Sequence, residues 1–149
     1  MSSPTAPMLD LCNLTVIVDF DGTLTKKVVD GKPQPSLLSL LISEKYLSKQ
    51  GVEKSQALFE HYYPIELNPD IPAAGKEQLM QEWWEKSIAV LLEEKVTLEM
   101  IHEITRSPLV QFRDQLVEFL NMLALRRTPL IIYSASGIGT DAITHLLEH

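Results

Sequence analysis

The chain has 149 residues, of which 45% are hydrophobic and 22% charged, so it is long enough to bury the core of one globular domain. Twenty acidic and thirteen basic residues give a net charge of −7, and no cluster of Lys and Arg appears, which argues against a nucleic acid polymer as partner. The single cysteine, Cys12, excludes an internal disulfide and a Cys-rich zinc site. The N-terminus lacks a signal-peptide pattern and no apolar stretch is long enough to cross a bilayer, so we expect a cytoplasmic protein without a membrane partner.

The first predicted element is a strand over Leu14–Phe20, after a flexible tail over residues 1–12. Its unbroken apolar run is typical of a buried parallel strand. A turn is expected next, at Asp30-Gly31-Lys32-Pro33.

Helical patterns dominate the following segment. The predicted helices span residues 36–49, 54–62, 74–95 and 97–106. Gly51 is expected to stop the first of them, and Pro64 to end the second, with a loop over residues 65–70. Thr97 is the predicted N-cap of the fourth.

The pair Ser107-Pro108 resembles a cap followed by proline at the first helical position, and predicts an amphipathic helix through Leu123. A second buried strand is expected over Leu130–Tyr133. A turn over residues 136–139 then leads to a last helix that Thr140 caps. A simple crossover between two parallel strands needs only about a dozen residues. We therefore interpret roughly residues 30–107 as a helical insertion that covers the strand ends and excludes water.

Two acidic residues, Asp19 and Asp21, end the first predicted strand and precede a Gly-Thr turn. Alternate side chains of a strand share a face, so both carboxylates can converge at its C-terminal end, where parallel α/β sheets build their sites. One carboxylate can then bind a metal and attack, while the other moves a proton. The alternative is a strand that ends in a polar turn, where Asp is common without any catalytic role.

The string Asp19-Phe20-Asp21-Gly22-Thr23 resembles the first motif, Asp-x-Asp-x-Thr, of the haloacid dehalogenase-like phosphatases. The strand that leads to Ser134 is similar to their second motif. The resemblance implies that Asp19 is the nucleophile that forms an aspartyl-phosphate, and that Asp21 protonates the leaving oxygen and later activates water. It also implies that Mg²⁺ is held by the Asp19 carboxylate and the Asp21 carbonyl, and that Ser134 hydrogen-bonds the phosphoryl oxygens.

Three further strings resemble the cytosolic type III pyrimidine 5′-nucleotidases, and the similarity covers about residues 14–149. The strings are Tyr62-Tyr63-Pro64-Ile65-Glu66-Leu67-Asn68-Pro69, Glu82-Trp83-Trp84-Glu85-Lys86-Ser87, and Ser134-Ala135 followed by Gly137-Ile138-Gly139. By this resemblance, Glu66 reads the base or ribose of a nucleotide, Ser87 shapes the base pocket, and Ala135 supplies a backbone contact. A carboxylate suits a base amino group or a ribose hydroxyl because both donate hydrogen bonds.

Alternatives stay open for three of these residues. Trp83 or Trp84 can stack on a base, although aromatic residues at helical spacing more often belong to a core. Ser87 can simply bond to a carbonyl of the preceding helical turn.

The four histidines form no metal cluster with acids in the sequence.

The resemblance implies an α/β fold, with a partial Rossmann-like core of parallel strands and a helical C1-type cap inserted between the first two motifs. We expect the core over residues 13–29 and 108–149 and the cap over residues 30–107. Gly22 stands where the nucleotidases usually have Met, and Ser136 lengthens the turn beside the phosphate site. The Lys and the Gly-Asp-x-x-x-Asp segment that the superfamily places after the second strand do not occur before His149. The C-terminal part of the core is therefore expected to be missing.

The predicted function is that of a Mg²⁺-dependent 5′-nucleotidase acting on UMP-like or CMP-like nucleoside monophosphates. The alternatives are a phosphatase for another small phosphomonoester, and an inactive nucleotide-binding or partner-binding protein. We expect the 149-residue chain alone to turn over more slowly than about 1 per second, if at all. An incomplete sheet is also expected to self-associate through its exposed edge.

Overall fold

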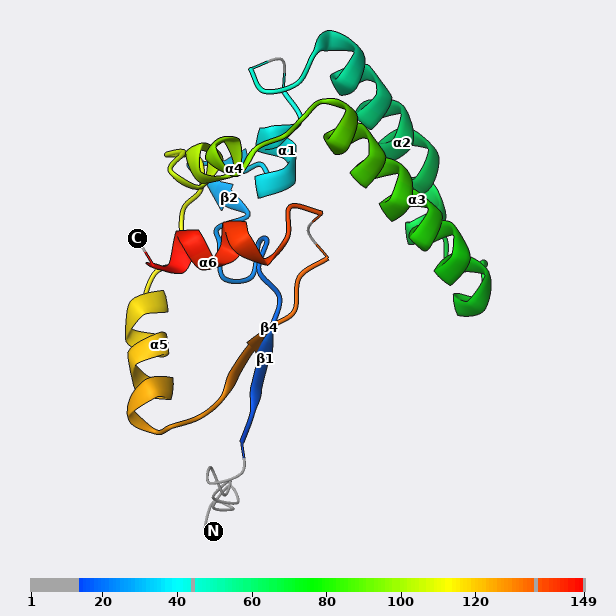
Figure 1. Ribbon diagram of the computed structural model, residues 1–149. Coiled ribbons are helices and arrows are strands. Elements are labelled where there is room, and N and C mark those ends of the chain that lie inside the picture. Colours follow the sequence, from blue (N-terminus) through cyan, green and yellow to red (C-terminus); the bar gives the residue numbers. More distant parts are fainter. Residues whose placement is uncertain (1–13, 44, 136, 149) are drawn as a thin grey trace.

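The computed structural model describes residues 14–43, 45–135 and 137–148. Strand β1 (Val16–Val18) lies beside strand β4 (Leu130–Ile132), and the two are parallel, with Ile17 opposite Ile131 (Figure 1). The predicted parallel pairing is therefore confirmed. The predicted tail, Cys12 and Ser136 lie outside the described residues.

The two faces of this sheet differ. Val18 and Ile132 pack against the hydrophobic core, whereas Ile17 is 67% exposed and Ile131 is 48% exposed. The prediction that the strands are buried is right for the first face and wrong for the second. The physical reason is that one sheet face needs one covering layer, and the described residues supply a layer on one side only.

The hydrophobic core lies between the turn after β1 and three short helices. These helices are α1 (Leu37–Leu41), α4 (Leu98–Thr105) and α6 (Thr140–Glu148). Phe20, Leu41 and Ala142 are completely buried there. Thr97 caps α4 by accepting a hydrogen bond from Met100 N, as predicted. Helix α6 begins at Thr140, which is its first helical residue and was predicted to be its cap.

A small hairpin follows the first turn. Strands β2 (Val28–Val29) and β3 (Lys32–Pro33) pair antiparallel, and Asp30 and Gly31 connect them with φ angles of 50° and 74°. Two successive positive φ angles define the turn type that matches the twist of a two-residue hairpin. The predicted turn is confirmed.

The helix predicted over residues 36–49 is wrong. The chain instead forms α1 and then a separate helix, α2 (Lys49–Leu67), each opened by a serine cap: Ser36 accepts from Ser39 N and Ser48 accepts from Gly51 N. Gly51 was expected to stop a helix, but it lies in the first turn of α2. Ser48 satisfies a free backbone N–H group where α2 starts. This local effect outweighs the apolar periodicity, which continues from α1 toward residue 49.

Helix α2 also continues past its predicted end. Pro64 lies inside the helix, and Asn68 is the C-cap, so the loop predicted over residues 65–70 begins three residues late. Proline removes one helical hydrogen bond, so other contacts must stabilise the last turn of α2. Packing of Tyr62 against the next helix stabilises this part of α2, since Tyr62 is almost fully buried.

That next helix, α3 (Ala73–Glu93), agrees closely with the prediction over residues 74–95. Helices α2 and α3 lie side by side as a long hairpin that projects from the core (Figure 1). The rings of Tyr62 and Trp83 stack between them, with centroids 5.8 Å apart. No helix among the described residues is both long enough and apolar enough to cross a bilayer.

The carboxylate of Glu94 links α3 to the start of α2. It accepts hydrogen bonds from Ser48 N at 2.7 Å and from the Ser48 hydroxyl at 2.8 Å, and these bonds hold the pKa of Glu94 below its usual value. A lowered pKa means that the charged form stabilises the fold at neutral pH and that this contribution is lost as pH falls through the folded-state pKa. We expect Glu94→Gln to lower the unfolding temperature at pH 7, with the deficit shrinking at pH 3. Circular dichroism melts at pH 7 and pH 3 test this, with Glu77→Gln as the control. An equal loss of unfolding temperature at the two pH values would contradict the prediction.

The helix predicted from Pro108 is wrong over its first half. Residues 107–115 form turns and an isolated antiparallel bridge between Thr25 and Phe112, and α5 (Leu116–Leu125) begins only afterwards. Gln115 has a φ of 65°, which breaks any continuous helix at that point. The backbone of this segment pairs instead with the turn after β1, a partner that helical periodicity does not reveal.

Candidate functional site

The two acids found in the sequence lie together at the C-terminal end of β1. Asp19 and Asp21 line one open cavity of about 420 Å³, which also contains Lys26 and Lys27. The Thr23 hydroxyl donates to Asp19 Oδ2 at 3.2 Å. Both predicted acids thus line the same cavity, and their catalytic roles stay a prediction.

Phe20 anchors the turn that follows these acids. Its side chain is completely buried, and its carbonyl oxygen accepts hydrogen bonds from the N–H groups of Thr23, Leu24 and Thr25 at 3.0–3.2 Å. Gly22 has a φ of 75°, a left-handed conformation that glycine adopts without strain. The buried Phe20 therefore fixes the conformation of the turn through these three hydrogen bonds.

A short segment, residues 111–114, runs along the outside of this turn. Lys26 N donates to Gln111 O at 2.7 Å, and Arg113 N donates to Leu24 O at 2.9 Å. The Arg113 guanidinium donates to Thr23 O at 2.8 Å and to Gly22 O at 2.7 Å. The sequence reasoning missed Arg113, because a lone basic residue inside a predicted helix carries no signal of this pairing.

Strand β4 delivers Ser134 and Ala135 to the same end of the sheet. Tyr133 N donates to Val18 O at 2.8 Å, so the two strands stay together up to the residue before Asp19. Ser134 comes next in the chain, directly after the last residue that pairs with β1. Ala135 then lines a second cavity.

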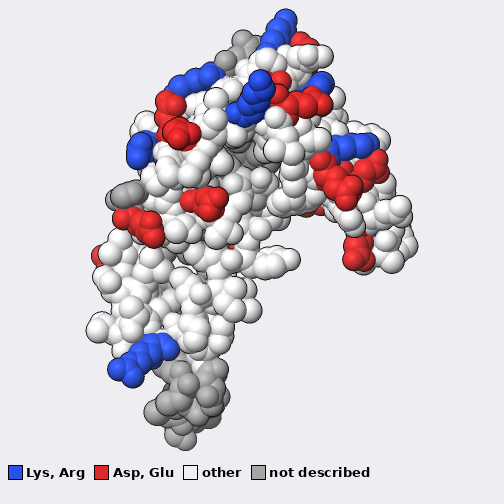
Figure 2. Space-filling view, viewed as in Figure 1, with Lys and Arg blue, Asp and Glu red and all other residues white. Residues whose placement is uncertain are grey.

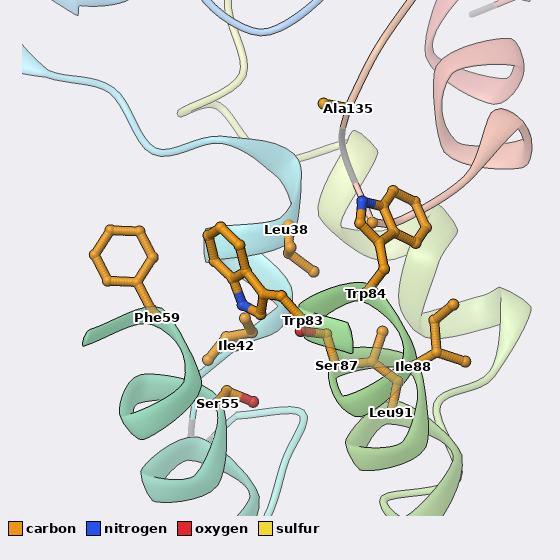
Figure 3. Close-up of a pocket in the computed structure, with 11 residues that line it drawn as sticks. Leu38, Ile42, Ser55, Phe59, Trp83, Trp84, Ser87, Ile88, Leu91 and Ala135 are labelled. Carbon is orange, nitrogen blue, oxygen red and sulfur yellow. The ribbon is translucent and has the colours of Figure 1, made fainter. Parts of the chain in front are cut away.

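This second cavity has a volume of about 160 Å³ and lies between α1, α2, α3 and the segment after β4 (Figure 3). Its lining is mostly apolar and comprises Leu38, Ile42, Ser55, Phe59, Trp83, Trp84, Ser87, Ile88, Leu91, Ala135 and Gly137. A space of this size accommodates one aromatic ring. Two predicted binding residues, Ser87 and Ala135, therefore lie on opposite walls of one cavity. Among the described residues, the Ser87 hydroxyl makes no bond to the preceding helical turn.

The two tryptophans have different surroundings. Trp83 stacks on Tyr62 and lies 6.3 Å from the Phe59 ring, so it belongs to the contact between α2 and α3. Trp84 is 43% exposed and points from α3 toward Ala135 (Figure 3). Of the two, Trp84 has the free ring surface that stacking on a base requires.

Glu66 lies apart from both cavities. It is exposed in the last turn of α2, and its carbonyl oxygen accepts a hydrogen bond from Lys76 Nζ at 2.7 Å. Glu66 follows the cavity residue Phe59 by seven positions, which places it on the same helical face about 10 Å further along the axis. Its predicted contact with a nucleotide stays a prediction.

The oxygen atoms at the end of β1 suit Mg²⁺, which prefers one or two carboxylates and completes its shell with water and phosphate oxygens. Asp19 and Asp21 supply such oxygens on the wall of an open cavity. Groups of three or more His, Cys, Asp or Glu that could hold a metal do not occur in the part of the chain that is described. His102 and His145 stack on each other with centroids 3.8 Å apart, and His145 Nδ1 lies 2.8 Å from the Thr105 hydroxyl, so this pair belongs to the packing of α4 on α6.

Basic and acidic side chains are interspersed over the visible face of the molecule, and this face has no continuous basic stripe (Figure 2). That distribution agrees with the negative net charge of the sequence.

Known proteins resemble the chain both in sequence and in structure. The pyrimidine 5′-nucleotidase (UMPH-1) family matches residues 22–149. The 7-methylguanosine phosphate-specific 5′-nucleotidase of Homo sapiens is 36% identical over 126 residues, which cover 85% of this chain and 42% of that protein. Form B of that enzyme in Xenopus laevis is 33% identical over 135 residues, which cover 91% of this chain and 46% of the relative.

A crystal structure of cytosolic 5′-nucleotidase IIIB bound to cytidine has a similar fold, with a TM-score of 0.70 and 25% identity, over 92% of this chain and 47% of that one. The chain thus spans less than half the length of the relatives it matches. The family resemblance inferred from the motifs is confirmed: this chain belongs to the pyrimidine 5′-nucleotidase (UMPH-1) family.

Proposed function

We propose that this protein is a Mg²⁺-dependent 5′-nucleotidase that hydrolyses a nucleoside monophosphate, with the phosphate at Asp19 and Asp21 and the base beside Trp84. The observation that carries the proposal is the path of the chain after β4. Strand β4 pairs with β1 as far as Tyr133, whose N–H donates to Val18 O, and Ser134 and Ala135 follow directly, with Ala135 lining the apolar cavity. The chain thus passes from the sheet end that carries the acids to an apolar ring-sized cavity within a few residues, and this supports a phosphate site and a base site for the two ends of a nucleotide.

The chemistry follows from the two carboxylates. An oxygen of Asp19 attacks phosphorus and forms an aspartyl-phosphate, while Asp21 gives its proton to the departing 5′-oxygen of the nucleoside. Asp21 then takes a proton from water, whose oxygen attacks phosphorus, so that phosphate leaves and the Asp19 carboxylate is restored. Mg²⁺ held by the Asp19 carboxylate and the Asp21 carbonyl would neutralise charge between the nucleophile and the phosphate.

The cavity size favours a single-ring base, so a UMP-like or CMP-like substrate is the first choice. A second candidate substrate is a 7-methylguanosine phosphate, for which several of the relatives are named. Its base is cationic and would be attracted to the face of Trp84. Titrations with CMP and with 7-methylguanosine monophosphate, monitored by tryptophan fluorescence, compare the affinities for the two candidate substrates.

Binding and turnover of nucleotides test the proposed function directly. In the presence of Mg²⁺, we expect CMP or UMP to quench the fluorescence of Trp83 and Trp84, the only tryptophans of the chain, while ribose 5-phosphate does not. Equal binding of the nucleotides and phosphoserine would favour a phosphatase for another small phosphomonoester. Nucleotide binding without phosphate release by excess protein would favour an inactive binding protein.

Glu66 provides a sharper comparison between substrates. We expect Glu66→Ala to weaken nucleotide binding while leaving the release of phosphate from an aryl phosphate unchanged, because the aryl ring offers no donor to a carboxylate. Glu60→Ala, on the same helix, serves as the control. An equal loss for both substrates contradicts a role of Glu66 in reading the nucleoside.

The open face of the β1–β4 sheet supports self-association of the 149-residue chain. Ile17 is 67% exposed, Ile131 48% and Tyr133 77%, whereas parallel sheets normally have both faces covered. We expect dimers or larger species in light scattering at micromolar concentration, and monomers after Ile17→Lys. Leu92→Lys, which changes an equally exposed residue of α3, is the control. A wild-type chain that stays monomeric at every concentration refutes the prediction.

A further inference from the structure

Arg113 lies against the turn after Asp21, outside the cavity that holds the two acids. Its guanidinium donates to the carbonyl oxygens of two adjacent residues, Gly22 and Thr23, at 2.7 and 2.8 Å. Because the two contacts come from one rigid planar group, they fix the directions of both carbonyls together.

Each of these carbonyls belongs to a planar peptide unit whose N–H points the opposite way. The Gly22 carbonyl shares its unit with Thr23 N–H, and the Thr23 carbonyl shares its unit with Leu24 N–H. Both N–H groups donate to the carbonyl oxygen of the buried Phe20, at 3.2 and 3.0 Å. Arg113 and Phe20 therefore hold the same two peptide planes from opposite ends.

Residues 111–114 support this clamp through further contacts with the turn. Thr25 and Phe112 form an antiparallel bridge, and Lys26 Nζ lies 2.7 Å from Asp114 Oδ1. Phe112 packs against the hydrophobic core, and Arg113 O accepts from Leu116 N at the start of α5. The segment that carries the Arg113 guanidinium is therefore held by contacts with the turn, with the hydrophobic core and with the start of α5.

We propose that Arg113 is a positioning residue for phosphoryl transfer, which fixes the turn after Asp21 so that the Asp19 and Asp21 oxygens keep their places at the cavity. This inference rests on the proposed function for its catalytic consequence. Its structural part, the clamping of two peptide planes, stands on the hydrogen bonds alone.

Amide hydrogen exchange of the full 149-residue chain tests the clamp without any ligand. We expect Arg113→Ala to accelerate exchange at Thr23 and Leu24 by about tenfold or more, since two hydrogen bonds from a charged donor are lost. Exchange in α2 and α3 should stay unchanged. Arg126→Ala removes an exposed arginine at the end of α5 and is the matched control. Added guanidinium ion at millimolar concentration should restore protection to Arg113→Ala, whereas an equal concentration of sodium chloride should not.

Single-turnover phosphate release tests the catalytic part. We expect Arg113→Ala to slow the step by about tenfold with little change in nucleoside affinity, and guanidinium to restore the rate. Unchanged exchange at Thr23 and Leu24 overturns the clamp, and faster exchange with an unchanged rate overturns the positioning role. A wild-type chain that binds nucleotide without turnover favours the inactive binding protein over the proposed function. In that case, amide exchange and its restoration by guanidinium still decide whether Arg113 holds the turn.

Discussion

Asp19→Asn is expected to reduce the release of phosphate from CMP or UMP by on the order of 10³-fold or more, because an amide cannot attack phosphorus. The fold should survive, since an amide oxygen can still accept the hydrogen bond that the Thr23 hydroxyl gives to Asp19. Measurement under single-turnover conditions, with protein in excess over nucleotide, resolves even a slow wild-type rate. Binding of cytidine should persist, because the apolar cavity is lined by other residues.

Asp21→Asn separates the two carboxylates. Asp21 acts through its proton, so its loss should slow esters with a poor leaving group more than activated aryl phosphates. Asp19→Asn should slow both equally, since both substrates need the nucleophile. Retention of more than a tenth of the wild-type rate by Asp19→Asn would contradict nucleophilic attack by this residue.

Trp84→Ala is expected to weaken nucleoside binding by about 10- to 100-fold, the loss that follows from removing one aromatic ring stacked on a base. The variant should fold, because Trp84 is 43% exposed. Calorimetric titration with cytidine measures the loss without relying on fluorescence from the substituted residue.

Two variants on the same helix make this result specific. Leu92→Ala alters a residue that is 72% exposed and does not line the cavity, so nucleoside affinity should stay as in the wild type. Trp83→Ala removes a ring stacked between α2 and α3, so loss of stability should dominate its effect. If Trp84→Ala binds cytidine as tightly as Leu92→Ala does, the base does not stack on Trp84.

Local patterns were sufficient where one segment determines its own structure. The apolar run before Asp19, the Asp30-Gly31 turn, the long helix through Trp83 and the cap at Thr97 all follow from periodicity and capping within a few residues. The same patterns were insufficient at Gly51 and Pro64, where a second serine cap and the packing of Tyr62 decide the outcome.

The candidate site divides in the same way. The sequence by itself pointed to the acids Asp19 and Asp21, because they follow an apolar strand run one residue apart, and its rare strings pointed to Ser87 and Ala135. Both tryptophans line the cavity, and only the tertiary structure decided that Trp84 keeps an exposed ring while Trp83 stacks on Tyr62, since that depends on how α2 packs against α3. It alone brought Arg113 to the turn after Asp21, because hydrogen bonds between segments ninety residues apart leave no periodic trace in either one.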